Sequence, residues 1–370
     1  MSAKNGERIC IAYGGGYVIV NGATSSVCEL LASELGGFFT IGAELPHEGN
    51  LVGEVTFHHD PAARDDIEKT FRRSKGVPLV MHAPSDPKHR RYGIKIEAPS
   101  STYVIRTTKA GTFKYDRETA KIAVYHADEI DGGKELRRVI RDQLFVPWLE
   151  QQGYFAIHSA AFANTLGDGT LVVGQGGSGK TTFFVSALAQ RSYRMLSTDR
   201  TLVKLTDEGI LALGVPEAVN FLPGTLAQFP ELRDLSESSP AERFWARNSK
   251  FHVPWRLLYG RFAAQPSHSK VLLKRIVFPE YGAQWECRTL SPAETREKLE
   301  EELLTADRDL PVPNWMEIYK QRDTSAETLL ESMSHVHAEA VRWNGVSEIS
   351  RYLAHATRPE RESVMPLGPR

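Results

Sequence analysis

Residues 174–182 (Gly-Gln-Gly-Gly-Ser-Gly-Lys-Thr-Thr) fit the phosphate-binding loop G-x-x-x-x-G-K-[ST] at every fixed position. Glycine has no Cβ, so the backbone can curl and direct successive N–H groups toward phosphate oxygens. The lysine of such a loop reaches the β- and γ-phosphates, and the hydroxyl that follows it ligates Mg²⁺. The predicted binding residues for a nucleoside triphosphate and Mg²⁺ are Gly174, Gly176, Gly177, Ser178, Gly179, Lys180, Thr181 and Thr182.

Transfer of a phosphoryl group also needs a side chain that positions or deprotonates the attacking hydroxyl. Asp199 is the first candidate, because it ends the next predicted strand after the loop. Its alternative role is a turn cap, since aspartate is common at strand ends. His158, on the strand before the loop, is the second candidate, and its alternative is a histidine that is simply buried in the core.

The elements around these residues must bring them together. Thr170–Val173 reads as a buried strand and Thr182–Ala189 as a helix, which is the strand–loop–helix context that a phosphate loop requires. A glycine turn that merely begins a helix is the alternative. Phe155–Phe162 and Tyr193–Ser197 are predicted as further strands. If the second runs parallel and next to the strand of the loop, Asp199 lies beside the phosphates.

Three segments in order carry a resemblance to a known family: residues 153–161 with His158, the loop at 174–182, and Leu196-Ser197-Thr198-Asp199. Together they resemble the catalytic domain of the HPr kinase/phosphorylase family, and more specifically its shortened HPr-kinase-like relatives. Phosphoenolpyruvate carboxykinases have a related nucleotide-binding core. The resemblance covers roughly residues 135–280. The loop alone predicts phosphate binding but no particular reaction.

The resemblance implies ATP and Mg²⁺ as ligands and a role for each matched residue. The histidine that matches His158 lies near the transferred phosphate, and the residues that match Lys180 and Thr181 hold the nucleotide and the metal. Asp199 matches the second of two paired aspartates, whereas Thr198 stands at the position of the first. Asp199 is therefore assigned both tasks, as proton acceptor and as metal ligand, and the predicted catalytic residues are Asp199, His158 and Lys180.

The resemblance also implies a function and a fold. The expected function is ATP-dependent transfer of the γ-phosphate to an alcohol, with a serine on a peptide or protein as acceptor. The alternatives are a small-molecule hydroxyl, as in an amino acid, sugar or nucleoside, and a nucleotide-dependent switch that is not a kinase. Residues 213–220 lack the glycine-rich signature of the true family, so phosphorylase activity is not expected. The expected fold is an α/β P-loop kinase core of the HPr kinase type, with an N-terminal α+β domain and a helical C-terminal extension.

The predicted divisions of the chain are an accessory domain at 1–130, the catalytic domain at 131–290, the helical extension at 291–357 and a disordered tail at 358–370. A hairpin is expected around Gly14-Gly15, and helices at about 27–35 and from Pro61. Capping boxes at 291–294 and 324–327 predict two C-terminal helices, the second through about Val341. Residues 215–268 contain six prolines and read as a long loop.

Composition limits the partners. The formal net charge of −1 gives no basic field for nucleic acid, and no apolar run is long enough to cross a bilayer. The first residues lack a signal-peptide core, and Cys10, Cys28 and Cys287 read as reduced thiols, so a cytoplasmic location is expected. Homo-oligomers are an implication of the resemblance. The cations of the proline-rich loop could stabilise the negative charge that develops during transfer; they are Arg243, Arg247, Lys250, Arg256 and Arg261. For each of them taken singly, the alternative is a solvated position on the surface. Arg200 is expected to be exposed, and no structural zinc is expected.

Overall fold

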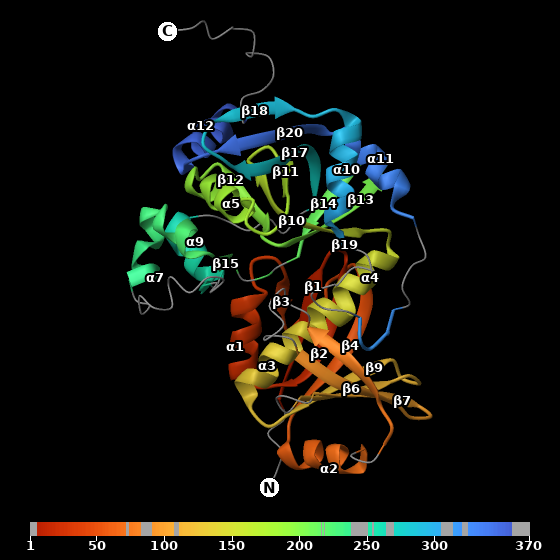
Figure 1. The fold of residues 1–370 in the computed structure, drawn as a ribbon. Helices are drawn as coiled ribbons and strands as arrows, with labels where there is room; N and C mark the ends of the chain where they lie inside the picture. Colours follow the sequence, from red (N-terminus) through yellow and green to blue (C-terminus); the bar gives the residue numbers. More distant parts are fainter. Residues whose placement is uncertain are drawn as a thin grey trace, which may run out of the picture.

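The structure is a computed structural model, and it describes residues 6–71, 74–82, 91–106, 111–215, 217, 219–237, 251–253, 255–263, 270–304, 314–319 and 325–356. Its strands form two mixed sheets of nine described strands each, one in each half of the chain, and a small two-stranded sheet. A long helix joins the halves, with the first sheet below and the second above in Figure 1. No helix in the described part of the chain is long and apolar enough to span a membrane.

The first sheet contains the strands of the N-terminal half in the order β3-β1-β2-β4-β9-β8-β7-β6-β5. Gly14 and Gly15 have φ values of 64° and 96°, as the predicted β1–β2 hairpin requires. The strands are β1 (Glu7–Tyr13), β2 (Gly16–Ala23), β3 (Thr40–Gly42), β4 (Asn50–His59), β5 (Val77–His82), β6 (Arg91–Glu97), β7 (Ser101–Arg106), β8 (Gly111–Asp116) and β9 (Lys121–His126).

Two predicted helices accompany this sheet. Helix α1 (Ser25–Glu34) buries Val27 and Leu31, and α2 (Pro61–Phe71) begins at the predicted proline. The side chain of Thr24 caps α1 by accepting a hydrogen bond from the backbone of Val27. Helix α1 therefore begins two residues before the predicted start at about residue 27.

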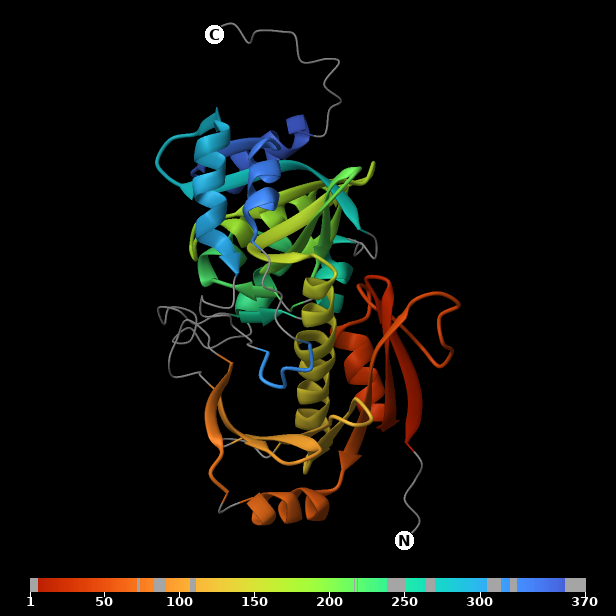
Figure 2. The same ribbon diagram turned by 90° about the vertical axis from the view of Figure 1, so that its right-hand side faces the viewer.

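The connecting helix runs without a break from residue 129 to residue 151, as α3 (Glu129–Arg138), a π-helical segment η2 (Val139–Phe145) and α4 (Val146–Gln151). Every residue of η2 is buried. Figure 2 shows this helix running from beneath the second sheet down alongside the strands of the first. Apolar spacing predicts the helix, and Pro147 lies within it, directly after the π-helical segment.

The second sheet has the order β11-β10-β13-β14-β17-β20-β18, and β12 and β19 pair with β10. A pairing between β11 and β17 closes the first five strands into a ring. The strands are β10 (Phe155–Asn164), β11 (Asp168–Val173), β12 (Tyr193–Ser197), β13 (Arg200–Thr206), β14 (Gly209–Gly214), β17 (Val271–Tyr281), β18 (Glu286–Thr289), β19 (Leu303–Leu304) and β20 (His337–Trp343).

Helices cover both faces of the second sheet. Helices α5 (Lys180–Ala189) and α12 (Val346–Ala356) pack together on one face, and α10 (Pro292–Glu302) and α11 (Glu327–Ser334) pack on the other. The predicted capping box at Ser291 is confirmed at the start of α10. The hydrophobic core on the face of α10 and α11 is separate, whereas the core on the face of α5 and α12 continues into the N-terminal half.

The expected α/β P-loop kinase core with a helical C-terminal extension is wrong. Among the described pairings of the second sheet, only β11–β17 and β17–β20 are parallel, so the sheet is not built from repeated strand–helix–strand units. Residues after 290 do not form a separate helical layer, because β19 and β20 pair within this sheet. The helix predicted through Val341 ends at Ser334, and its continuation is β20.

The proline-rich region from 215 to 268 is not a plain loop where it is described. Strands β15 (Val219–Phe221) and β16 (Phe251–Val253) pair, and buried Leu226, Phe229 and Leu258 anchor the short helices. These helices are α6 (Pro223–Ala227), η3 (Pro230–Leu232), α7 (Arg233–Glu237) and α9 (Trp255–Phe262). The predicted disordered tail, residues 358–370, lies outside the described residues.

A short segment of the C-terminal half, residues 314–319, packs on the first sheet (Figure 2). Trp315 is buried and its ring lies 4.9 Å from that of Phe113. Glu317 forms a 2.9 Å ion pair with Lys95. The chain therefore ties the two sheets together at a second place besides the connecting helix.

Candidate functional site

The phosphate loop has the predicted context. Strand β11 ends at Val173 and α5 begins at Lys180. Gly174, Gly177 and Gly179 have φ values of 153°, 91° and 107°, which L-residues with a side chain rarely adopt. Gly179 is the N-cap residue of α5, so the loop leads directly into the helix N-terminus, where backbone N–H groups can bind an anion.

Two of these glycines are also required by close packing. A Cβ at Gly179 would lie 2.5 Å from Cζ2 of Trp343, a buried residue at the end of β20. A Cβ at Gly174 would lie 2.9 Å from Oγ of Ser178. By contrast, nothing in the described part of the chain lies within 4 Å of a Cβ at Gly176 or Gly177. The loop is therefore supported from behind by Trp343 and open at its middle.

The three residues after the last loop glycine have different environments. Lys180 is buried, and its Nζ donates to the carbonyl of Gly174 and, at 3.2 Å, to that of Gln175. The ammonium group is thus held over the loop. Thr181 is half-buried, whereas Thr182 is buried with its hydroxyl 3.2 Å from that of Thr225. Ser178 Oγ is buried and has no hydrogen-bond partner among the described residues.

Asp199 and His158 lie together. The β12–β13 turn carries Asp199, whose Oδ1 is 3.3 Å from Nε2 of His158 on β10. The turn is fixed to β10 by a 3.1 Å hydrogen bond from the backbone N–H of Ser159 to the carbonyl of Asp199. The expected parallel neighbour is wrong in one respect: β12 is not adjacent to β11, because β10 runs between them and pairs antiparallel with both. His158 therefore comes from the strand between the loop strand and the Asp199 strand.

Glu302 is a site residue that sequence reasoning missed. Its Oε2 lies 2.6 Å from Nδ1 of His158, and its side chain is only 7% exposed. The carboxylate comes from the last residue of α10, and β19 continues directly into pairing with β10 at Ala156 and Ile157. No spacing signal links Glu302 to His158, because 144 residues separate them. Three consecutive glutamates end the helix, and only the fold distinguishes the third.

The two carboxylates determine the charge of the histidine. The hydrogen bonds to Asp199 and then to Glu302 raise the pKa of His158 from 6.5 to about 9, while burial and the charge of Lys180 oppose the rise. Near neutral pH the ring is therefore an imidazolium between two carboxylates. The effect of Lys180 on this pKa means that its ammonium lies within electrostatic range of the imidazole. The three predicted catalytic residues are thus brought to one region.

The neighbours of Asp199 differ from expectation. Thr198, in the position of the missing first aspartate, is buried, and within the described chain its hydroxyl has no hydrogen-bond partner. Arg200 was expected to be exposed, but it is buried and donates to Asp142 at 2.7 Å and to Glu217 at 2.9 Å. Its guanidinium is therefore committed to these carboxylates and not to a phosphate.

The structure locates few of the cations of the proline-rich region. Arg261 forms a surface pair with Asp234, with Nη1 2.8 Å from Oδ1. Arg243, Arg247 and Lys250 lie outside the described residues, as does the side chain of Arg256. A role in clamping charge therefore stays a prediction for these residues.

The residues present fit a nucleotide and a divalent cation. The loop is an open cradle of left-handed glycines followed by a lysine, and Thr181 and Asp199 supply a hydroxyl and a carboxylate, the oxygen ligands that Mg²⁺ prefers. Among the described residues no group of three or more histidine, cysteine, aspartate or glutamate side chains could hold a metal. Mg²⁺ in such sites is bound by one or two protein oxygens together with substrate phosphates.

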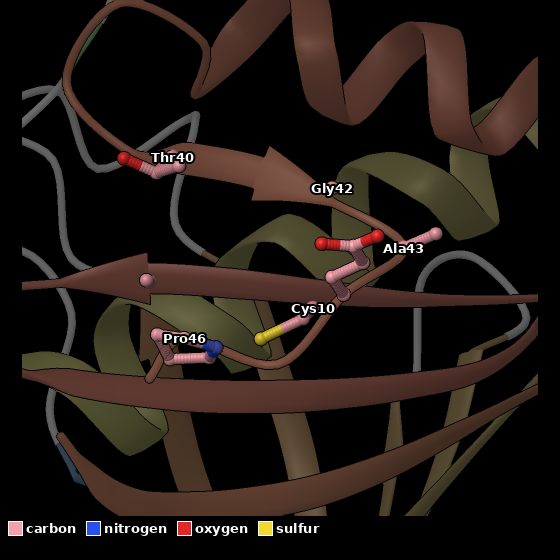
Figure 3. Close-up of a pocket in the computed structure, with 7 residues that line it drawn as sticks. Cys10, Thr40, Gly42, Ala43 and Pro46 are labelled. Carbon is pink, nitrogen blue, oxygen red and sulfur yellow. The ribbon is translucent and has the colours of Figure 1, made fainter. Parts of the chain in front are cut away.

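A separate hollow of about 450 Å³ lies on the first sheet, over β1 and β3 and beside the segment that follows β3 (Figure 3). Its lining is mostly small and apolar, and Glu44 is its one charged residue; the others are Cys10, Ala12, Thr40, Gly42, Ala43 and Pro46. None of the predicted site residues lines it. The phosphate loop, and not this hollow, is therefore the candidate site.

The comparisons with known proteins gave no relative: no protein-family model matches the chain, and the search of curated proteins found no match.

Proposed function

We propose that this protein is an ATP-dependent phosphotransferase that moves the γ-phosphate to an alcohol acceptor. The observation that carries the proposal is the 3.3 Å contact between Asp199 and His158 within electrostatic range of Lys180. A phosphate loop alone would suit any nucleotide-binding protein. A carboxylate and an imidazolium within electrostatic range of the loop lysine add the groups that phosphoryl transfer needs.

Each residue has a distinct role in this proposal. The loop amides and Lys180 bind the phosphates, and Thr181 and Asp199 would hold Mg²⁺. When bound, the metal neutralises charge that develops on the phosphates. The acceptor oxygen forms a bond to the γ-phosphorus as the bond to the β–γ bridging oxygen breaks, and Asp199 takes the hydroxyl proton. His158, charged and oriented by Glu302, stabilises negative charge on the transferred group.

The site contains two carboxylates although the motif supplies one. Thr198 occupies the place of the first family aspartate, and Glu302 reaches the same histidine from α10. Asp199 is about half exposed, whereas Glu302 is buried. Asp199 is therefore the better placed of the two to meet an acceptor, and Glu302 is the better placed to hold the ring. By the resemblance to HPr-kinase-like proteins, we propose a serine of a peptide or protein as acceptor.

The test is transfer of label from γ-³²P-ATP to serine peptides and, in parallel, to amino acids, sugars and nucleosides. Lys180→Ala should weaken ATP binding, and Asp199→Asn should bind ATP but lower transfer by about 10²–10⁴-fold. Asp207→Asn, an exposed aspartate at the other end of β13, is the matched control. Label found only in ATP and inorganic phosphate would favour a nucleotide-dependent switch, and transfer that survives in Asp199→Asn would refute the assigned base.

A further inference from the structure

The residue after Asp199 is the anchor of a buried ionic cluster. Arg200 pairs with Asp142 at 2.7 Å and Glu217 at 2.9 Å, and Arg141 pairs with Asp142 at 2.8 Å. The side chain of Asp142 is fully buried, and those of Arg141 and Arg200 are at most 7% exposed. The cluster joins the β12–β13 turn to the π-helical segment η2 of the connecting helix.

Stability alone does not explain such a cluster. Removing charged groups from water is expensive, and well-packed apolar residues in their place are often equally or more stabilising. What a buried ion pair does provide is a directional tether, because a bidentate or charge-assisted hydrogen bond has a narrow geometry. Here the tether ends on the residue next to the catalytic carboxylate.

The exposure of the two adjacent side chains in the turn indicates which group the Arg200–Asp142 ion pair positions. Asp199 is 47% exposed and Arg200 is 5% exposed, so these adjacent side chains point in opposite senses, one to the site and one to the interior. On the side of β10 the turn is fixed by the backbone hydrogen bond from Ser159 to Asp199 and by a buried hydroxyl network of Ser159, Ser197 and Thr201. On the side of the connecting helix the corresponding anchor is Arg200 with Asp142.

We propose that Asp142 and Arg200 are positioning residues: through their ion pair the connecting helix holds the β12–β13 turn so that Asp199 faces His158. The proposal deepens the proposed function and rests on it. The N-terminal half thereby takes part in the site, because η2 continues α3, which packs on α1 and β9 of the first half. A second tie supports this connection: the hydroxyl of Tyr13 in β1 donates to the carbonyl of Gly214 in β14, the partner strand of β13.

The first test compares Asp142→Asn with Asp131→Asn, which makes the same change on the same helix at a surface pair with Lys134. Asp142→Asn should keep its dissociation constant for ATP without Mg²⁺ within about twofold while kcat for transfer falls about 10- to 100-fold, as expected when a catalytic group is displaced. Asp131→Asn should change neither. Equal kcat values for the two variants would overturn the proposal.

A second test does not depend on activity. In crystal structures of the two variants, the distance from Asp199 Oδ1 to His158 Nε2 should lengthen beyond hydrogen-bonding range in Asp142→Asn and stay near 3.3 Å in Asp131→Asn. An unchanged distance would overturn the positioning role even in a protein that transfers no phosphate. A lengthened distance in a protein without transferase activity would refute the function and leave the positioning intact. If Asp142→Asn does not fold, Arg200→Lys, which keeps the charge but loses the planar fork, takes its place in both tests.

Discussion

His158 Nδ1 lies 2.6 Å from Glu302 Oε2, so a residue of α10 completes a site whose other parts lie between residues 158 and 199. The imidazole is thereby held from both sides, by Glu302 at Nδ1 and by Asp199 at Nε2. The segment after residue 290, expected from sequence to be an appended helical layer, therefore contributes a side chain to the candidate site.

The charge of His158 should make stability depend on pH. Its pKa is raised from 6.5 to about 9 on folding, by Asp199 first and Glu302 second. Because the folded state binds this proton more tightly than the unfolded state, the protonated ring contributes to the free energy of unfolding. This contribution is complete below about pH 6.5 and is lost as the pH rises through about 9. The difference in free energy of unfolding between wild type and His158→Asn, measured with urea, should therefore shrink over this range.

Two further variants make the pH prediction specific. In Glu302→Gln the same loss should be smaller and complete at a lower pH, because one of the two carboxylates that raise the folded-state pKa of His158 is gone. His335→Asn removes an exposed histidine and should show no comparable trend. A pH-independent difference for His158→Asn would contradict the proposed charge state.

The glycines of the loop should not be equivalent. Gly179→Ala places a side chain at a φ of 107° and against Trp343, so it should weaken ATP binding by about tenfold or more. Gly176→Ala meets open space in the described structure and should bind within about twofold of wild type. Titration with a fluorescent ATP analogue measures both, and equal affinities would contradict the packing argument.

Thr181 should govern the need for metal. Thr181→Val removes the hydroxyl with little change in volume, so half-maximal transfer should require more Mg²⁺, whereas Thr181→Ser should restore the wild-type requirement. Thr225→Val, which changes the hydroxyl facing Thr182, serves as the control outside the metal position. A Mg²⁺ requirement identical in Thr181→Val and wild type would remove Thr181 from the set of ligands.

The buried cluster should respond strongly to the loss of one partner. Burial raises the pKa of Asp142, but the charges of Arg141 and Arg200 outweigh it and hold that pKa well below its usual range. Arg200→Ala strands this carboxylate and should cost about 3–5 kcal/mol in the free energy of unfolding. Arg261→Ala breaks an exposed pair and should cost little, since water screens it. Urea unfolding of both variants compares the two environments.

The parts of the site that sequence predicts are local patterns. The strand before the loop, the loop, its helix, the strand of His158 and the turn of Asp199 all lie within about fifty residues, and each has its own periodicity or turn signal. Their grouping at one edge could be expected. The order of the strands could not: whether β12 lies beside β11 or beyond β10 depends on long-range pairing and leaves no mark in either strand.

The missed residues share a physical cause. Arg200 reads as a surface residue in the sequence, because its partners Asp142 of η2 and Glu217 after β14 are brought to it only by the fold. Glu302 resembles its neighbours Glu300 and Glu301 until β19 pairs with β10. Strand β20 contains alanine and glutamate, which favour helices, but its place beside β17 outweighs that local preference. In each case tertiary context decides the role.

The contact between Gly179 and Trp343 has a consequence for biosynthesis. During translation the phosphate loop leaves the ribosome more than a hundred and fifty residues before the indole that supports it. Until β20 has paired with β17, Gly179 at the start of α5 lacks its packing contact with Trp343. If the loop binds a nucleotide as proposed, tight affinity should therefore appear only after β20 has been synthesised and has paired with β17.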